Sequence, residues 1–381
     1  MKNFAQNAFA FFKKETVLCI AFVLAVISFI PAVSLEGAVV FLSCTGGIDF
    51  HVLGLLFCLM SVVAGWQKLL VFRRCGNFLI GKLKHTRAIY LLLIYFCFFT
   101  SMILTNDVAL ITFVPFSVML LPMIGQKKRL IFIVVMQTIA ANLGSMLTPL
   151  GNPQNLYLYA TSGMTLPAFM GYLFPAWMVS LVLITLPFFF LKNEPISAPD
   201  ETTLPPREPG KELVFTILFV LCLLCVLDVL PYQALFVITL ITLLAADKSI
   251  LGQVDYFLLI TFVCFFIFVY NIKLIPEISS FLSGVLEGNE FRVGLLCSQF
   301  ISNVPATLLL AGFTENYAPL LLGVNIGGLG TLIASLASLI SFKLYLASND
   351  SKGGKYFATF TLWNLLYLIV LCILCHFMYA L

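Results

Sequence analysis

Residues 130–191 read LIFIVVMQTIAANLGSMLTPLGNPQNLYLYATSGMTLPAFMGYLFPAWMVSLVLITLPFFFL. These 62 residues contain no Asp, Glu, Lys or Arg, whereas a helix needs only about 20 apolar residues to cross a bilayer. Inside lipid each backbone polar group must be paired within its own segment, so such runs are expected to be helices. The stretch is long enough for two crossings, which predicts a membrane protein with several spans.

The rest of the chain has the same character. Hydrophobic residues make up 61% of the 381 residues and charged residues 10%, whereas soluble domains carry about 25% charged residues. Further charge-free runs cover residues 16–34, 256–272, 316–342 and 356–381. The net charge of +4 comes from basic residues in short loops between these runs, which indicates membrane topology and not a nucleic-acid partner.

The opening stretch also contains one copy of an internal repeat. From Asn142 the chain reads Asn-Leu-Gly-Ser-Met-Leu-Thr-Pro-Leu, and from Asn325 it reads Asn-Ile-Gly-Gly-Leu-Gly-Thr-Leu-Ile. Upstream of each copy a polar group interrupts an apolar run, Thr105-Asn106-Asp107 in one half and Ser302-Asn303-Val304 in the other. An ordered set of matches like this predicts a duplicated architecture.

The repeat divides the chain into residues 1–191, a cytoplasmic linker at 192–212 and residues 213–381. Each half is predicted to contain three spans, a segment broken at its middle, and two more spans. The broken segments, around residues 88–126 and 291–314, are expected to be re-entrant hairpins. The predicted fold is therefore an all-α polytopic membrane protein with about ten transmembrane helices and two re-entrant hairpins in two inverted repeats.

Charge bias supports this arrangement. It places most of the 21 basic residues on one side, which an excess of Lys and Arg marks as the cytoplasm. These are Lys68, Arg73, Arg74, Lys82, Lys84, Arg87, Lys127, Lys128, Arg129, Lys192, Arg207, Lys211, Lys248, Lys343, Lys352 and Lys355. Both chain ends are then predicted to lie outside the cytoplasm, although this puts Lys13 and Lys14 on the side where basic residues are rare.

Polar side chains at the two breaks are the first candidate ligands. Thr105, Asn106, Ser302 and Asn303 offer hydroxyl and amide groups near the middle of the membrane, where transporters with broken helices bind their ions. Asp107 is the one charged residue within 88–126, and a carboxylate at that depth is costly unless it is paired or solvated. It is either a proton or cation carrier or an N-terminal cap of the following helix.

A second group of candidates follows each repeated asparagine. Two prolines and a glycine within Thr148–Asn155 exclude a regular helix and predict a broken helix around residues 142–155. A matching break is expected around 325–338. The candidates in these two segments are Asn142, Thr148, Gly151, Asn152, Asn155, Asn325, Gly327 and Thr331.

At these residues the chain resembles the ion transporter superfamily, which includes arsenite permeases, NhaD-type sodium/proton antiporters and divalent anion:sodium symporters. The resemblance rests on Thr105-Asn106-Asp107-Val108-Ala109-Leu110, Gly151-Asn152-Pro153-Gln154-Asn155, Ser302-Asn303-Val304-Pro305-Ala306 and Asn325-Ile326-Gly327-Gly328. It implies a scaffold domain, a transport domain that carries both hairpins and moves as an elevator, and a homodimer. The dicarboxylate branch has Ser-Asn-Thr at both tips, so Thr-Asn-Asp and Ser-Asn-Val resemble the arsenite-permease branch more closely.

The predicted function is secondary active transport of a small anion or oxyacid, coupled to Na⁺ or H⁺, across the inner (cytoplasmic) membrane. No cofactor is expected beyond Na⁺ as a coupling ion, with a candidate site at Asn106, Asp107 and Asn303. The partners expected are the lipid bilayer and the small ion. A Na⁺/H⁺ antiporter that uses Asp107 is the close alternative. A channel and an intramembrane enzyme are disfavoured, the latter because Asp107 lacks the second carboxylate that an aspartyl mechanism needs.

Overall fold

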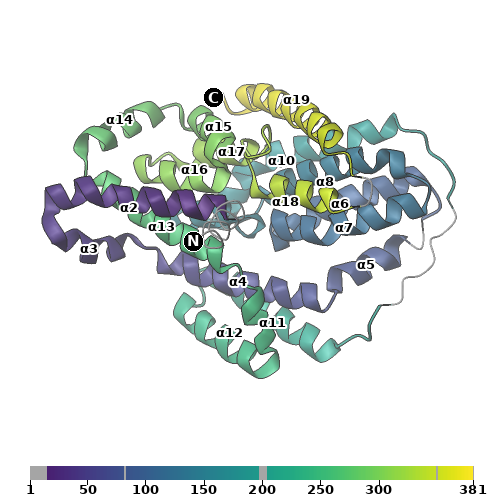
Figure 1. The fold of residues 1–381 in the computed structure, drawn as a ribbon, viewed down its shortest axis with the longest axis horizontal. Helices are drawn as coiled ribbons and strands as arrows, with labels where there is room; N and C mark the ends of the chain where they lie inside the picture. Colours follow the sequence, from purple (N-terminus) through teal and green to yellow (C-terminus); the bar gives the residue numbers. More distant parts are fainter. Residues whose placement is uncertain (1–14, 81–82, 197–203, 349–350, 381) are drawn as a thin grey trace, which may run out of the picture. The chain divides into compact units, whose positions relative to one another are not determined.

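The computed structural model describes residues 15–80, 83–196, 204–348 and 351–380, and these residues form helices and connecting turns without a β-sheet (Figure 1). Contacts divide the chain into two compact units. Unit 1 contains Met1–Gly65, Leu213–Glu287 and Leu308–Thr314. Unit 2 contains Trp66–Glu212, Gly288–Thr307 and Glu315–Leu381. Each unit is therefore assembled from both halves of the sequence. The predicted repeat boundaries at 191 and 213 stay a prediction.

Unit 1 is built around the packing of α2 on α13. A buried hydrogen bond from Asn271 Nδ2 to Ser28 Oγ (2.9 Å) joins these two helices. Its helices are α2 (Thr16–Glu36), α3 (Val40–Ser43), α4 (Phe50–Lys68) up to Gly65, α11 (Pro209–Val226) from Leu213, α12 (Tyr232–Ala246), α13 (Tyr256–Lys273) and α14 (Pro276–Leu286). Its 3₁₀ turns are η1 (Gly37–Val39), η2 (Cys44–Gly47), η5 (Lys248–Gln253) and η6 (Ala311–Phe313).

Unit 2 is built around α8, whose residues from Ile133 to Ser145 are all buried. Helices α6, α7, α10, α18 and α19 pack around it, and Figure 1 shows α6, α7, α8 and α18 side by side. The helices of this unit are α5 (Val71–Ile80), α6 (Thr86–Leu104), α7 (Asn106–Met123), α8 (Leu130–Ser145), α9 (Pro153–Ser162), α10 (Leu166–Phe189), α15 (Glu290–Ile301), the part of α16 (Asn303–Leu310) up to Thr307, α17 (Tyr317–Ile326), α18 (Leu336–Leu346) and α19 (Gly353–Tyr379). The turns η3 (Lys127–Arg129) and η4 (Pro149–Gly151) precede α8 and α9.

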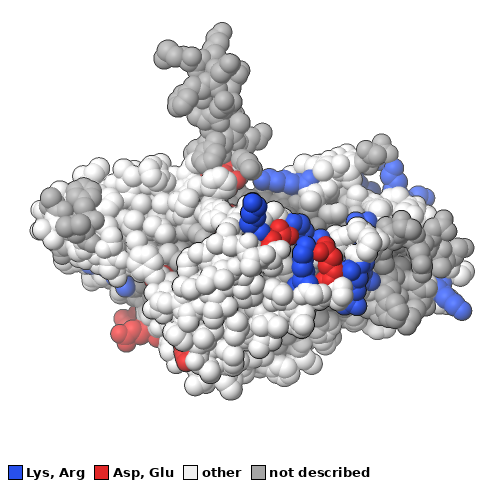
Figure 2. Space-filling view, turned by 90° about the horizontal axis from the view of Figure 1, so that it is seen from below, with Lys and Arg blue, Asp and Glu red and all other residues white. Residues whose placement is uncertain are grey.

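The prediction of an all-helical protein with several membrane spans is confirmed. Within the described ranges eight helices are long and apolar enough to cross a membrane, and four apolar segments are shorter. Helix breaks separate α6 from α7 and α15 from α16 at the predicted polar positions. Large apolar side chains such as Ile30 on α2 (73% exposed) and Phe377 on α19 (79% exposed) point outward, as lipid-facing residues do. On the face drawn in Figure 2 charged side chains occupy only limited areas.

The described residues of the predicted linker at 192–212 contact other parts of the chain. Its first residues lie along the start of α6, where Thr86 N–H donates to Glu194 O (3.0 Å) and Ile196 N–H to Lys84 O (3.0 Å). Its last residues are held by Arg74 Nη2, which donates to Pro205 O (2.7 Å). Residues 197–203 lie outside the described residues.

The described residues before the first hairpin contain two helices of spanning length, α2 with 21 residues and α4 with 19. The predicted three spans of this part stay a prediction. The connection between them contains η1, the four-residue α3 and η2, which are far too short to cross a bilayer. Two crossings, by α2 and α4, would put the start of α2 on the same side as Lys68. The predicted outside location of the N-terminus depends on a third crossing in this half; residues 1–14 themselves lie outside the described residues.

A fusion experiment tests the number of crossings. We expect green fluorescent protein placed before Met1 to fluoresce and alkaline phosphatase at the same place to be inactive, because two crossings leave the start of α2 on the cytoplasmic side with the basic loops. The same two reporters placed after Leu381 serve as the reference and should give the opposite pattern. Active phosphatase at the N-terminus would restore the three-span prediction.

Candidate functional site

Two helix breaks with the same backbone conformation form the centre of the candidate site. Thr105, between α6 and α7, has φ 77° and ψ 149°. Ser302, between α15 and α16, has φ 72° and ψ 152°. This region is occupied almost only by glycine, and a residue with a side chain there costs about 1–3 kcal/mol. Such strain is maintained only where the surrounding structure fixes the backbone.

A hydrogen bond of the same kind fixes each break. Thr148 Oγ1 donates to Met102 O, and Thr331 Oγ1 donates to Gln299 O (2.9 Å). Each threonine lies six residues after a repeated asparagine, and each carbonyl lies three residues before a break. The two predicted threonines therefore tie the segments after Asn142 and Asn325 to the two breaks.

Glycines allow this close approach. A Cβ atom on Gly144 would collide with the carbonyl of Phe98, seven residues before the first break. A Cβ atom on Gly327 would lie 2.9 Å from Leu295 Cα, seven residues before the second. The repeated Asn-x-Gly pattern thus keeps one helix backbone directly against another.

The two repeated asparagines each bind side chains from the other half of the chain. Asn325 Oδ1 accepts from Asn152 Nδ2 (3.1 Å), and Asn325 Nδ2 donates to Asn155 Oδ1 (2.6 Å). In the reciprocal set, Asn142 Oδ1 accepts from Ser335 Oγ (3.0 Å) and Asn142 Nδ2 donates to Ser338 Oγ (3.5 Å). The contacted residues lie ten and thirteen positions after the opposite asparagine in both cases.

The first break joins this arrangement through Asn106, whose Nδ2 donates to Asn142 Oδ1 (2.9 Å). Ser145 joins it through Asn152 Nδ2 (3.2 Å). We call these side chains the asparagine network, and each is at most 5% exposed. Its members are Asn106, Asn142, Ser145, Asn152, Asn155, Asn325, Ser335 and Ser338.

The unwound segment between α8 and α9 is held from within. Asn155 Nδ2 donates to the carbonyls of Met146 (2.8 Å) and Thr148 (3.0 Å). Asn152 caps α9 by accepting from the N–H of Asn155 (2.8 Å). Gly151 lies so close to Ser145 that a Cβ atom would overlap its carbonyl. These contacts satisfy carbonyls that the end of α8 leaves without helical partners.

The remaining predicted residues lie around the network. The amide nitrogen of Asn303 would be 3.0 Å from a Cβ atom on Gly328, and the carbonyl of Gly328 accepts from Asn142 Nδ2 (3.4 Å). Asp107 lies in the first turn of α7, half-buried, and its N–H donates to Asn106 Oδ1 (3.0 Å). The candidate Na⁺ site at Asn106, Asp107 and Asn303 stays a prediction.

Sequence reasoning missed Gln299, Ser145 and the contacts of Ser335 and Ser338. Extending the repeat to offsets of ten and thirteen would have matched Asn152 with Ser335 and Asn155 with Ser338. Gln299 had only a weak signal, because the matching position of the first half is Met102 and the repeat therefore does not mark it.

The network is built of amides and hydroxyls, so its members carry no formal charge. It includes the first residue of α7, the N-cap residue of α9 and the N-cap residue of α18, which are Asn106, Asn152 and Ser335. Helix N-termini carry partial positive charge and favour anions. The arrangement can therefore replace the hydration of a small anion with amide, hydroxyl and helix-end donors.

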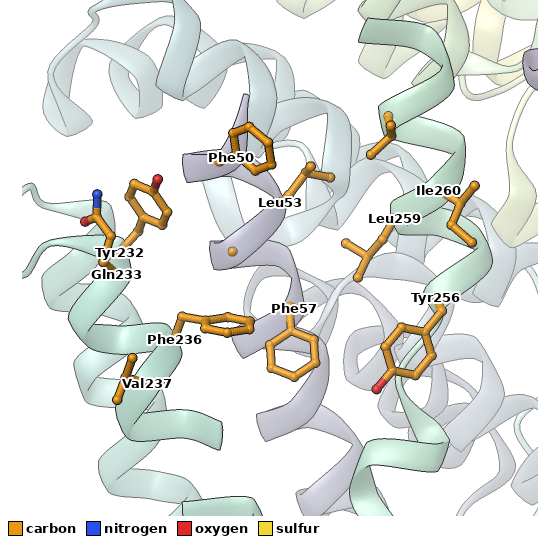
Figure 3. A pocket seen from close by; sticks show the side chains of 12 residues that line it. Phe50, Leu53, Phe57, Tyr232, Gln233, Phe236, Val237, Tyr256, Leu259 and Ile260 are labelled. Carbon is orange, nitrogen blue, oxygen red and sulfur yellow. The ribbon is translucent and has the colours of Figure 1, made fainter. Parts of the chain in front are cut away.

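Unit 1 contains a pocket of about 570 Å³ with different chemistry. It lies among α4, α12 and α13, and Figure 3 shows Phe57 and Phe236 facing one another there. Their ring centroids are 5.1 Å apart. Apart from Tyr232, Gln233 and Tyr256 its lining is apolar, so it offers little to recognise an ion.

Known proteins that resemble this chain are membrane proteins and transporters. Residues 9–321 match the family model CitMHS, described as citrate transporter. An uncharacterized transporter of Methanocaldococcus jannaschii is 34% identical over 297 residues, which cover 76% of this chain and 79% of that protein. The inner membrane protein YbiR of Escherichia coli is 28% identical over 314 residues, 80% of this chain and 82% of its own.

The strain at the two breaks gives a stability prediction. Thr105→Gly and Ser302→Gly should each raise the free energy of unfolding by about 1 kcal/mol, because relief of about 1–3 kcal/mol of strain exceeds the entropy cost of glycine. Thr100→Gly, within the regular part of α6, is the matched control and should lower it by about 0.5 kcal/mol, because glycine has a lower helix propensity than threonine. Thermal unfolding in detergent measures all three. A loss of stability in both break variants, equal to that of the control, would contradict the strain.

Proposed function

Because the chain belongs to the citrate transporter family, we propose that it is a secondary active transporter of a small anion or oxyacid. The observation that carries the proposal is the asparagine network. It joins both repeated segments to the first helix break by hydrogen bonds between the two halves. Transporters built from two repeats bind their substrates where such broken helices meet.

The chemistry of the network favours an anion as substrate. Amide nitrogens and hydroxyls can donate to carboxylate or oxyanion oxygens, and three helix N-termini add partial positive charge. Full neutralisation of a di- or trivalent anion needs more positive charge than these groups supply. A co-transported Na⁺ or H⁺ would provide it, which is a physical reason for coupling.

An elevator mechanism accounts for the two units. Both strained residues and the whole network belong to unit 2, which contains segments of both halves. A unit that holds its ligand by internal contacts can move as one body and carry the ligand with it. We therefore assign transport to unit 2 and the scaffold role to unit 1.

An alternative is a Na⁺/H⁺ antiporter centred on Asp107. The observation that favours it is the position of this carboxylate beside Asn106, a member of the network. Proton exchange for Na⁺ at one carboxylate would need no anion. The two functions differ in whether Asp107 is indispensable.

Location and assembly extend the proposal. We place the protein in the inner (cytoplasmic) membrane with its basic loops in the cytoplasm, the side to which two crossings also bring the start of α2. A homodimer, which the sequence resemblance implies, stays a prediction, and no enzymatic step is proposed.

A ligand screen tests the function. The purified protein is heated with Na⁺, Li⁺, arsenite, phosphate, sulfate, dicarboxylates and citrate, at several pH values. A ligand at 100 times its Kd should add about 2.7 kcal/mol of stability. We expect one anion to stabilise the protein, more strongly with Na⁺ or at acid pH. Stabilisation by Na⁺ or Li⁺ without any anion would favour the antiporter.

Substitution of Asp107 separates the two functions in proteoliposomes. Asp107→Asn should change the affinity for the anion but leave uptake measurable, since the amide keeps the size and much of the hydrogen bonding of the side chain. Asp255→Asn, at the cap of α13 in unit 1, is the matched control and should behave as the unaltered protein. Complete loss of ion exchange in Asp107→Asn alone would support the antiporter.

A further inference from the structure

The side chain of Gln299 makes three hydrogen bonds to the unwound segment that follows α17. Its Nε2 donates to the carbonyls of Gly327 (2.8 Å) and Leu329 (3.0 Å). Its Oε1 accepts from the N–H of Thr331 (3.0 Å). One side-chain amide of α15 therefore forms hydrogen bonds with backbone groups at both ends of the segment that follows α17.

The local backbone is shaped to admit this amide. Gly330 has φ 99°, and a Cβ atom there would collide with Gln299 Oε1. The positive φ favours glycine, and the missing side chain leaves room for the amide. The Gln299 amide can therefore occupy this position only because residue 330 is glycine.

The carbonyl of Gly328 lies between the two carbonyls that Gln299 holds. It faces the network instead and accepts from Asn142 Nδ2 (3.4 Å). The peptide group of this carbonyl includes the N–H of Leu329, which donates to Ile326 O (3.0 Å). Because the group is planar, that bond turns the Gly328 carbonyl to the opposite side. Gln299 holds the carbonyls on both sides of this peptide group, and it does so from outside the network.

In the first half a different side chain binds the carbonyls of the unwound segment. The residue three positions before its break is Met102, whose thioether has no N–H to donate. There Asn155 Nδ2 satisfies the carbonyls of Met146 and Thr148. The position that matches Asn155 in the second half is Ser338, which bonds Asn142. Gln299 thus supplies the amide that the second half lacks at that position.

We propose that Gln299 is a positioning residue of the ligand site: it holds residues 327–331 so that the carbonyl of Gly328 faces Asn142 and the ligand. This inference rests on the proposed function. Gln299 does not itself belong to the network, and it acts through the backbone that it holds.

Two variants remove the hydrogen bonds between the Gln299 amide and residues 327–331 in different ways. Gln299→Met introduces the residue of the first half, and Gly330→Ala displaces the amide while keeping it in the chain. Gly284→Ala is the control, because a Cβ atom there meets nothing within 4 Å. We expect both test variants to raise the KM for the transported anion about tenfold, the effect of 1.4 kcal/mol, with Vmax changed less than twofold. The control should change neither.

Hydrogen exchange of the backbone supplies the second readout, and it does not depend on transport. Residues 327–331 should exchange at least tenfold faster in both test variants and at the normal rate in the control. Unchanged exchange in both would overturn the inference. Faster exchange with an unchanged KM would also overturn it, since the contact would then stabilise the fold alone. If the unaltered protein transports no anion, the proposed function fails; faster exchange confined to this segment and to the helix of Asn142 would still support the positioning of the Gly328 carbonyl.

Discussion

Within a bilayer a backbone carbonyl that leaves its helix must find another donor. This requirement shapes the candidate site, because α8 and α17 both end inside the buried part of unit 2. Asn155 supplies the donor after α8, and Gln299 supplies it after α17. Once these amides hold the unwound segments, the repeated asparagines can reach across and bind the opposite half. The polar interior of unit 2 is therefore a consequence of interrupting two helices. The amides and hydroxyls that the interruptions require are the same groups that form the candidate site.

Much of this arrangement could be predicted from the sequence. Uncharged runs fixed the helical membrane class, and the Asn-x-Gly spacing located both broken segments. The reciprocal contacts of Asn142 and Asn325 were beyond reach, because they depend on which residues of one half face the other. Gln299 was missed for another reason, because a single amide on a helix produces no periodic pattern in the sequence. The number of spans before the first hairpin stays a prediction, because hydropathy alone does not distinguish the short helical pieces between Gly37 and Gly47 from a crossing.

Membership of the citrate transporter family and the chemistry of the network describe different things. The family defines the class of the protein, whereas the proposed substrate follows from the donors that the network offers. An uncharged network with three helix ends suits the small oxyanion that we propose, and the proposed co-transported cation would balance the rest of its charge. Asp107, beside the first break, is the carboxylate that we propose to test for this coupling.

The crossed pairing of the two halves has a consequence for how the chain is made. The first half enters the membrane before Asn325 and Ser335 have been synthesised. During that interval Asn142, Asn152 and Asn155 keep their partners within the first half but lack those of the second. Amide groups without partners in lipid are costly. The buried polar interior of unit 2 is therefore complete only after synthesis has passed Ser338, and the first half alone does not contain it.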